Sequence, residues 1–443
     1  MNKYIYLICF FAFTLSVNAQ EKTMEISLED AIKFALQNSY NSAVANNDIL
    51  SAEKTKWETT TMGLPQINAK VDYQNFLKQQ VTLADFDGDG VNEEFLFGTK
   101  QNVNATITLT QLLFDGSYLV GLESAKTYLK ISEQAKEKTA LTTRETIINA
   151  YGNVLVTEKS LEILLNNKIV NDRILKGARL GYENGLAELE DVEQFEIIEG
   201  NINSNIRSTR RLKNIAYKLL NISLGNKLNT KLILTDTLDG LVLTNLNLDI
   251  LSESFNLEKN VDYKIAENDR ESKRLLMKLE QSKALPSLNA FLNYGAQANS
   301  NSFTFLDGNQ RWFDSSLLGV SLNIPVFSSF KRSARTAQAK IALENADIRL
   351  EEAKQRLSLA AESAKSDYQL SIDNYQTAKK NLSLAEKIEK KQQIKFKEGI
   401  TTNFDLLQAQ NQLYSQQSAY VQAMLNIIAT KATLENALNT PIK

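Results

Sequence analysis

The most regular hydrophobic pattern lies in residues 328–398, which contain neither glycine nor proline. Apolar side chains recur there in heptads: Leu343, Ala346, Leu350, Ala353, Leu357, Ala360 and Ala364. A second apolar line follows Ala334, Ile341 and Ile348. One helix over this run would be roughly 100 Å long, at about 1.5 Å per residue. A single heptad seam is typical of a two-stranded coiled coil, so two seams predict a long helix with a neighbour on each side.

Four other stretches, residues 66–83, 99–114, 287–299 and 312–327, alternate apolar and polar residues, as strands with one apolar face do. Such strands suit a barrel with lipid outside and water inside. A half-buried sheet of a soluble domain alternates in the same way. The barrel is favoured because no other segment supplies a layer to cover the apolar face.

The chain is a duplication. The stretch from Leu64 to Tyr73 resembles that from Leu285 to Tyr294, at an offset of 221 residues (286 − 65 for the prolines). An internal repeat is identified first, because it determines the architecture of the whole chain. Each copy is predicted as helix, strand, strand, long helix, glycine turn and helix, and the fold class as mainly α with membrane β.

The expected organisation follows this repeat. A signal peptide covers residues 1–19, the first repeat 20–225, a connecting equatorial segment 226–255, the second repeat 256–438 and a short tail 439–443. Helices are predicted at 27–62, 115–184, 187–224, 257–284, 328–398 and 402–438. Short strands are expected at 232–234 and 241–243 within the connecting segment. The last helix shows an apolar stripe through Phe404, Leu407, Asn411, Tyr414, Ser418, Val421, Leu425, Ile428 and Ala432.

Four strands are too few to close a membrane barrel, because an open sheet edge in lipid leaves backbone groups unsatisfied. Closure therefore requires several chains, and the two helix seams also require neighbours. The residues predict a cyclic oligomer in which a β-barrel continues into a helical tube, and they leave the copy number open.

Composition narrows the alternatives. Lys3, an apolar run and Val17-Asn18-Ala19 indicate a secretory signal peptide. Cys9, the sole cysteine, lies inside that run without the small residues that precede a lipidated cysteine. Fifty basic against 52 acidic residues give no charge bias toward nucleic acid. The chain has no histidine and no nucleophile motif, which makes an enzyme an unfavoured interpretation.

An acidic loop lies between the first two strands. Asp85, Asp87 and Asp89 alternate, and Gly90 stands at the sixth position, as in the first half of a calcium loop. Leu96 occupies the twelfth position, where an EF-hand has a bidentate Glu, so this is not an EF-hand. A calcium-braced surface loop and an acidic solvated turn both remain open.

Several local patterns carry a resemblance to a known family. They are residues 260–267 in the first helix of the second copy, 285–288 opening a strand, 111–116 leading into a helix, and the hairpin tips 182–192 and 396–407. On these residues the chain resembles the TolC-like outer-membrane efflux proteins over essentially its whole length. The resemblance implies a homotrimer with twelve strands in one outer-membrane barrel and twelve helices in one periplasmic tunnel. It also implies an exit duct for efflux pumps or type I secretion, docked on a periplasmic adaptor and an inner-membrane RND or ABC transporter.

The resemblance places the closed constriction at the periplasmic tips. Asp405 falls on the first acidic position of the family's ring, and Gln408 stands where a second acid is found. Asp191 and Gln194 hold the corresponding places in the first copy. Thr401 replaces a basic latch residue of the family. Thr402 with Asp405 is also a helix-capping box, so a purely structural role stays open for this carboxylate.

The tip glycines have two interpretations. Gly185 and Gly399 suit left-handed helix ends without further function. The resemblance also makes them, with Leu186 and Ile400, the adaptor-docking residues. The main rival to a channel is a periplasmic or secreted coiled-coil scaffold or adhesin without a pore. It accounts for the helices and the signal peptide but leaves four one-sided strands unexplained.

Overall fold

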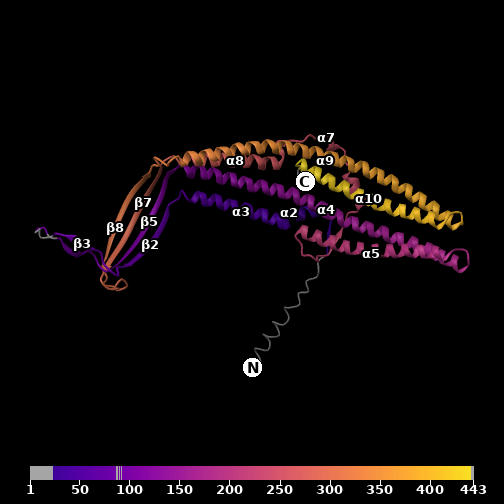
Figure 1. Ribbon diagram of the computed structural model, residues 1–443, viewed down its shortest axis with the longest axis horizontal. Helices are drawn as coiled ribbons and strands as arrows, with labels where there is room; N and C mark the ends of the chain where they lie inside the picture. The colour runs from indigo at the N-terminus through magenta and orange to yellow at the C-terminus, as the bar shows by residue number, and fades with distance from the viewer. Residues whose placement is uncertain (1–22, 86–87, 89, 91, 441–443) are drawn as a thin grey trace, which may run out of the picture. The chain divides into compact units, whose positions relative to one another are not determined.

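The computed structural model describes residues 23–85, 88, 90 and 92–440 (Figure 1). The chain forms two compact units, and each combines segments of both sequence repeats. Unit 1 contains the described residues up to Asp48, Glu133–Ile265 and those from Glu351 onward. Unit 2 contains Ile49–Ser132 and Ala266–Leu350. In the described residues, no helix combines the length and the apolar character that a membrane crossing requires.

Unit 2 holds one antiparallel sheet in the order β2, β5, β7, β8 (Figure 1). Its strands are β2 (Gln66–Asn75), β5 (Gln101–Asp115), β7 (Ser287–Ser300) and β8 (Trp312–Asn323). The first two come from the first repeat and the last two from the second, so the pairing of β5 with β7 joins the copies. Both outer strands, β2 and β8, pair with only one neighbour among the described residues.

The register puts mainly apolar side chains on one face and mainly polar side chains on the other, where Phe291, Phe313 and Leu317 are apolar exceptions. Aligned rows on the first face are Ile67–Leu109–Leu292–Leu318, Ala69–Ile107–Tyr294–Ser316, Val71–Ala105–Ala296–Asp314 and Tyr73–Val103–Ala298–Trp312. The row Lys70–Thr106–Gly295–Ser315 represents the opposite face. Asp314 and Ser316, both on the edge strand β8, are the polar exceptions in the apolar rows. The alternation read from the sequence is thus present in three dimensions.

Two predicted strands end earlier in the structure than the sequence analysis expected. The strand expected over 66–83 ends at Asn75, because Gly98 (φ 88°) turns the partner chain just before β5 begins at Gln101. Beyond that turn, β3 (Val81–Ala84) and β4 (Glu93–Leu96) form a separate hairpin. The strand expected over 312–327 stops at Asn323, since Pro325 has no amide hydrogen to donate.

The helices also differ in detail from expectation. The helix predicted at 27–62 is two helices, α2 (Leu28–Asn38) and α3 (Tyr40–Thr61), separated by extended backbone at Ser39. Gly225, with φ of 83°, lies against this break, and a Cβ on it would meet the Asn38 carbonyl oxygen at 2.2 Å. The break therefore accommodates the close approach of the end of α5. The long helix expected from 328 starts at Lys331, after positive φ angles at Ser329 and Phe330.

The remaining helices are α4 (Gly116–Glu183), α5 (Leu189–Leu224), α8 (Val261–Ser282), α9 (Lys331–Lys397) and α10 (Asn403–Ala437). In the connecting segment, β6 (Leu232–Leu234) pairs in parallel with β1 (Met24–Ile26). The strand predicted at 241–243 is wrong, because these residues belong to helix α6 (Leu238–Asn245). The Thr237 hydroxyl accepts the Gly240 amide and starts this helix. The short elements α7 (Asp249–Ser252) and η1 (Leu257–Lys259) follow.

Two buried tyrosines at matching repeat positions fix the connecting segment in unit 1. Tyr151 and Tyr368 are 217 residues apart (368 − 151), and both are fully buried. The Tyr151 hydroxyl lies within hydrogen-bond distance of the Ile26 carbonyl (3.1 Å) and of an Asp236 carboxylate oxygen (2.9 Å). The Tyr368 hydroxyl lies within hydrogen-bond distance of the carbonyls of Asn245 (2.5 Å) and Asn247 (3.1 Å). Each copy thus uses one tyrosine of its long helix to hold the short elements.

Candidate functional site

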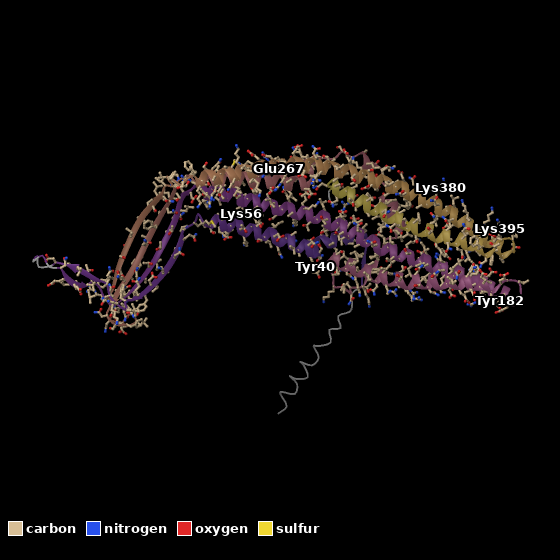
Figure 2. The ribbon with its side chains drawn as sticks, in the orientation of Figure 1. Tyr40, Lys56, Tyr182, Glu267, Lys380 and Lys395 are labelled. Atoms are coloured by element: carbon tan, nitrogen blue, oxygen red, sulfur yellow. The ribbon has the colours of Figure 1, made fainter. Side chains whose placement is uncertain are left out.

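The two hairpin tips of unit 1 have the same turn. Tyr182 and Lys395, labelled in Figure 2, lie in the last turns of α4 and α9. Gly185 and Gly399 follow with φ of 71° and 70°. The Leu186 amide donates to the Gly181 carbonyl and the Ile400 amide to the Lys395 carbonyl, each at 2.8 Å. This six-to-one bond is the Schellman pattern, in which glycine takes the left-handed position.

The residue after each glycine is apolar and points into solvent. Leu186 is 85% exposed and Ile400 is 73% exposed. In Schellman turns the corresponding hydrophobic residue frequently packs back onto the last helical turns. Neither side chain does so here, and a Cβ added to Gly185 or Gly399 would have open space around it. Both tips therefore present one free aliphatic side chain at the point where the chain reverses.

Asp405 closes a dense capping network at the start of α10. Its Oδ2 accepts the hydroxyls of Thr401 and Thr402, each at 2.9 Å, and its amide donates to the Thr402 hydroxyl at 3.2 Å. These hydrogen bonds, first that from Thr402 and then that from Thr401, lower the pKa of the exposed Asp405 carboxyl below its ordinary value. The capping box read from the sequence is present. Thr401, where the sequence departs from the family pattern, uses its hydroxyl as part of this cap.

The corresponding cap of the first tip is weaker. The Glu188 amide donates to Asp191 Oδ2 at 3.4 Å. Asp191 lies in the first turn of α5, and Gln194 follows one turn on. The Gln194 carbonyl oxygen accepts the Asn403 side-chain amide at 3.2 Å, which links the beginnings of α5 and α10. Of the four predicted constriction residues, Gln194 is thus the one bonded across the two tips.

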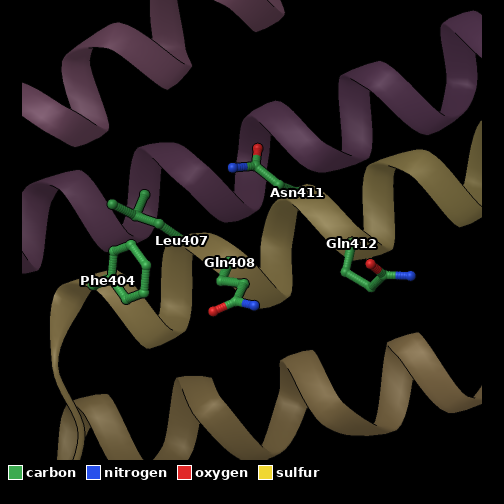
Figure 3. Close-up of a pocket in the computed structure, with 5 residues that line it drawn as sticks. All are labelled: Phe404, Leu407, Gln408, Asn411 and Gln412. Atoms are coloured by element: carbon green, nitrogen blue, oxygen red, sulfur yellow. The ribbon is translucent and has the colours of Figure 1, made fainter.

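Gln408 lies in an open groove on α10. Phe404, Leu407, Asn411 and Gln412 line this groove with it, around about 490 Å³ (Figure 3). Near the tip the apolar stripe predicted for α10 is only partly buried: Phe404 is exposed and Leu407 is half-buried, while Leu406 and Leu413, which lie off the stripe, are buried. The buried face of this half of the helix is set by contacts with the other tip helices, and the exposed face holds Gln408.

A small apolar cluster holds the four tip helices together. Its buried members are Leu175, Ala178, Val192, Phe195 and Leu406. Phe396 of α9 packs edge to face against Phe195 of α5, with ring centroids 6.0 Å apart. Helices from both repeats contribute to the cluster, so the two tips form one packed structure within unit 1.

A layer of buried polar side chains follows the cluster along the helices. Gln410 is fully buried, and neither of its amide atoms has a hydrogen-bond partner. Glu389 is also buried and accepts a hydrogen bond from Gln393. Burial raises the pKa of the Glu389 carboxyl, and burial with the charge of Glu389 raises the pKa of Tyr414 to about 12. Sequence reasoning missed these residues.

The predicted calcium loop is described only in part. Asp85 uses its carboxylate within the turn, where it accepts the amides of Gly88 (2.7 Å) and Gly90 (2.9 Å). Asp87 and Asp89 lie outside the described residues. Within the described parts of the chain, no group of three or more candidate ligands could hold a metal ion. Calcium binding at residues 85–94 stays a prediction from the sequence.

Comparison with known proteins finds outer-membrane proteins that are similar to this chain. Residues 256–440 match the family described as Outer membrane efflux protein. The outer membrane protein TolC of Vibrio cholerae serotype O1 is 24% identical over 344 residues, which cover 76% of this chain and 77% of that protein.

Two solved structures have the same fold. VceC of Vibrio cholerae, described as an outer membrane protein, superimposes with a TM-score of 0.72 at 16% identity, covering 94% of this chain and 97% of VceC. CusC, studied for folding and transmembrane channel formation, gives a TM-score of 0.73 at 16% identity, covering 96% of this chain and 95% of CusC. With its four-stranded sheet and duplicated long helices, this chain is similar in sequence and in fold to TolC-like outer membrane efflux proteins.

Proposed function

We propose that three copies of this chain close their sheets into one twelve-stranded barrel and their helices into one tunnel. The assembly would be the exit duct of a tripartite efflux pump or of a type I secretion system. The observation that carries this proposal is the open sheet, apolar on one face and polar on the other, with β2 and β8 each paired on one side only in the described residues. The number three is taken from the family resemblance.

Energetics supports closure by other copies. An unpaired backbone group in lipid costs several kcal/mol, and two long strand edges would expose many such groups. Pairing β8 of one copy with β2 of the next satisfies both edges at once. The apolar rows then face lipid and the polar rows face water, which is the arrangement of a membrane barrel with an aqueous interior.

The helices support lateral neighbours as well. Ile341 and Ile348, the second apolar line of α9, are exposed in the single chain. Large aliphatic side chains at heptad spacing indicate a helix contact, and the neighbouring copy would supply it. This contact places the long helices of adjacent copies side by side around a common axis.

The tips are proposed to dock on a periplasmic adaptor that links the duct to an inner-membrane RND or ABC transporter. Leu186 and Ile400 support this role because both are free apolar side chains at helix turns. Asp405 and Gln408, with Asp191 and Gln194, are proposed to line the closed constriction. Because the hydrogen bonds keep Asp405 ionised, three copies would form a ring of carboxylates that attracts cations.

The duct is a passive conduit in this proposal, and adaptor docking opens its tip. The test is planar-bilayer recording of the purified protein together with its native mass in detergent. A homotrimer that inserts and conducts ions is the expected result. A stable, folded monomer without conductance would instead support the coiled-coil scaffold or adhesin.

A further inference from the structure

The loop between β7 and β8, residues 301–311, folds back over one face of the sheet. Phe305 of this loop is 7% exposed and packs on Val103 and Ala298. Tyr73, Val103 and Ala298 are aligned neighbours across β2, β5 and β7, so they share a face. That face is the apolar one, because the next rows toward the helices contain Val71, Ala105 and Ala296, then Ala69, Ile107 and Tyr294.

Three aromatic rings form the contact between loop and sheet. Phe303 and Phe305 lie edge to face with centroids 5.7 Å apart. Tyr73 is edge to face with Phe303 at 5.9 Å and with Phe305 at 6.0 Å. Such pairs stabilise a defined ring geometry beyond the area they bury. We call Tyr73, Phe303, Phe305 and the nearby Leu306 the loop aromatic surface.

Polar contacts fix the loop in this position. The Thr304 hydroxyl donates to Gln310 Oε1 at 2.6 Å and to Ser300 Oγ at 3.0 Å. The Lys100 amide donates to Asn301 Oδ1 at 3.1 Å, which ties the loop to the segment before β5. Asn301, Thr304 and Gln310 thus use their side chains within the loop or against the strands, whereas the loop also carries the charged residues Asp307 and Arg311. Two apolar side chains of the loop remain outside, since Phe303 is 60% exposed and Leu306 is 87% exposed.

The position of this surface along the strands matches one edge of a membrane. From Val103 to Leu113, β5 runs ten residues, or about 33 Å at roughly 3.3 Å per residue. With the tilt of about 40° that is usual in barrels, this distance becomes about 25 Å, the height of the apolar band of outer-membrane barrels. Beyond the helix-side end of the sheet, Phe327 and Phe330 form a second exposed aromatic pair with centroids 6.0 Å apart.

We propose that the loop 301–311 is a lipid-binding element that inserts Phe303 and Leu306 among the acyl chains of the outer leaflet. The loop aromatic surface continues the apolar face of the sheet, and acyl chains are the partner that matches such a surface. This inference rests on the proposed function, in which that face contacts lipid. One consequence is that this loop lies outside the barrel wall and does not cover the channel mouth.

Tryptophan fluorescence in lipid vesicles tests the proposal. The chain has two tryptophans, Trp57 and Trp312, so replacing both with Phe leaves a background for single reporters. Three reporters are compared: Phe303→Trp in the loop, Val71→Trp on the apolar face of the sheet, and Leu186→Trp at a helix tip. Each protein is reconstituted into phosphatidylcholine vesicles with brominated acyl chains and, separately, titrated with aqueous iodide.

The expected result is that bromines quench Phe303→Trp as strongly as Val71→Trp, and that iodide quenches only Leu186→Trp. If bromine quenches Val71→Trp but iodide quenches Phe303→Trp, the proposal for the loop is overturned, while the proposal that the sheet faces lipid still holds. Absence of bromine quenching at Val71→Trp would overturn the assumption about the sheet itself. A second variant, Phe303→Ser with Leu306→Ser, should keep the wild-type single-channel conductance, and a changed conductance would place the loop at the mouth.

Discussion

Removing the two free aliphatic side chains at the tips, Leu186→Ser with Ile400→Ser, should abolish adaptor docking without weakening the fold. Burying one Leu or Ile side chain contributes about 1.5–3 kcal/mol. Leu186 and Ile400 are 85% and 73% exposed, so most of that contribution is absent from the free chain and becomes available on docking. Each substitution should therefore weaken docking by roughly tenfold or more, since about 1.4 kcal/mol corresponds to a factor of ten.

Two measurements check this prediction. Thr401→Cys introduces a thiol at the tip of a chain whose sole cysteine is Cys9. A thiol-reactive photo-crosslinker attached there joins the tip to its periplasmic partner in intact cells. The double Ser variant should lose the crosslinked product and drug tolerance together, while its thermal midpoint in detergent stays within a few degrees of wild type. The control variant Leu243→Ser removes a leucine of α6 that is 68% exposed and lies far along the chain from both tips, and it should keep the crosslink. Undiminished crosslinking and tolerance in the double variant would refute the docking role of these side chains.

Three further predictions follow from the packing and the caps. Gly225→Ala should lower the thermal midpoint far more than Gly399→Ala. The left-handed backbone costs an L-residue about 1–2 kcal/mol at either site, but only Gly225 also lacks room for a Cβ, because Asn38 lies against it. Equal midpoints for the two variants would contradict this prediction. Tyr151→Phe should destabilise unit 1 by about 1–2 kcal/mol, because the buried hydroxyl bonds a carboxylate and a carbonyl; an unchanged denaturant midpoint would count against the clamp. The folded-state pKa of Asp405 lies below its ordinary value, so the cap contributes its full stability above the unfolded pKa and loses it as the pH falls through the lower folded pKa. Cation block in single-channel recordings should therefore persist at a pH where an ordinary Asp is protonated, and it should disappear in Asp405→Asn. Block that fades at the ordinary pKa of Asp would contradict this prediction.

Local chemistry explains why much of the fold could be predicted from the sequence. Proline and glycine mark the ends of elements through constraints that act within a few residues. Pro325 ends β8, and Gly185 and Gly399 end the long helices. The heptads of residues 328–398 identify one very long helix because no breaker interrupts them. The strand alternation gave the two faces of the sheet correctly for the same reason, since side chains on a strand alternate whatever its partner.

The sequence alone did not predict element boundaries and side-chain roles that depend on contacts with segments distant in the chain. Leu77, Val81 and Leu83 continue the alternation of β2, but the strand ends because Gly98 removes its pairing partner. The apolar triplet at 241–243 fits a strand or a helix, and the cap from Thr237 selects the helix. The roles of Tyr151 and Tyr368 as clamps depend on segments about a hundred residues away in sequence.

The candidate site shows the same division. The capping box of Asp405 and the tip glycines are local patterns and were read correctly as structure. The bond between Gln194 and Asn403 joins two repeats and has no sequence signature. The exposure of Phe404 and the burial of Gln410 depend on which neighbours surround α10, and periodicity alone does not show which part of the stripe is buried.

The most direct test of the central claim is whether β2 of one copy pairs with β8 of another. One cysteine replaces Asp72 on β2, and a second is placed in turn at polar-face positions of β8 from Phe313 to Ser321. Both strands are then joined with a short bis-maleimide in the native membrane. At the positions that pair between copies, we expect covalent dimers and trimers, with the trimer as the largest product. Monomers alone at every position, or a ladder that extends beyond the trimer, would contradict it.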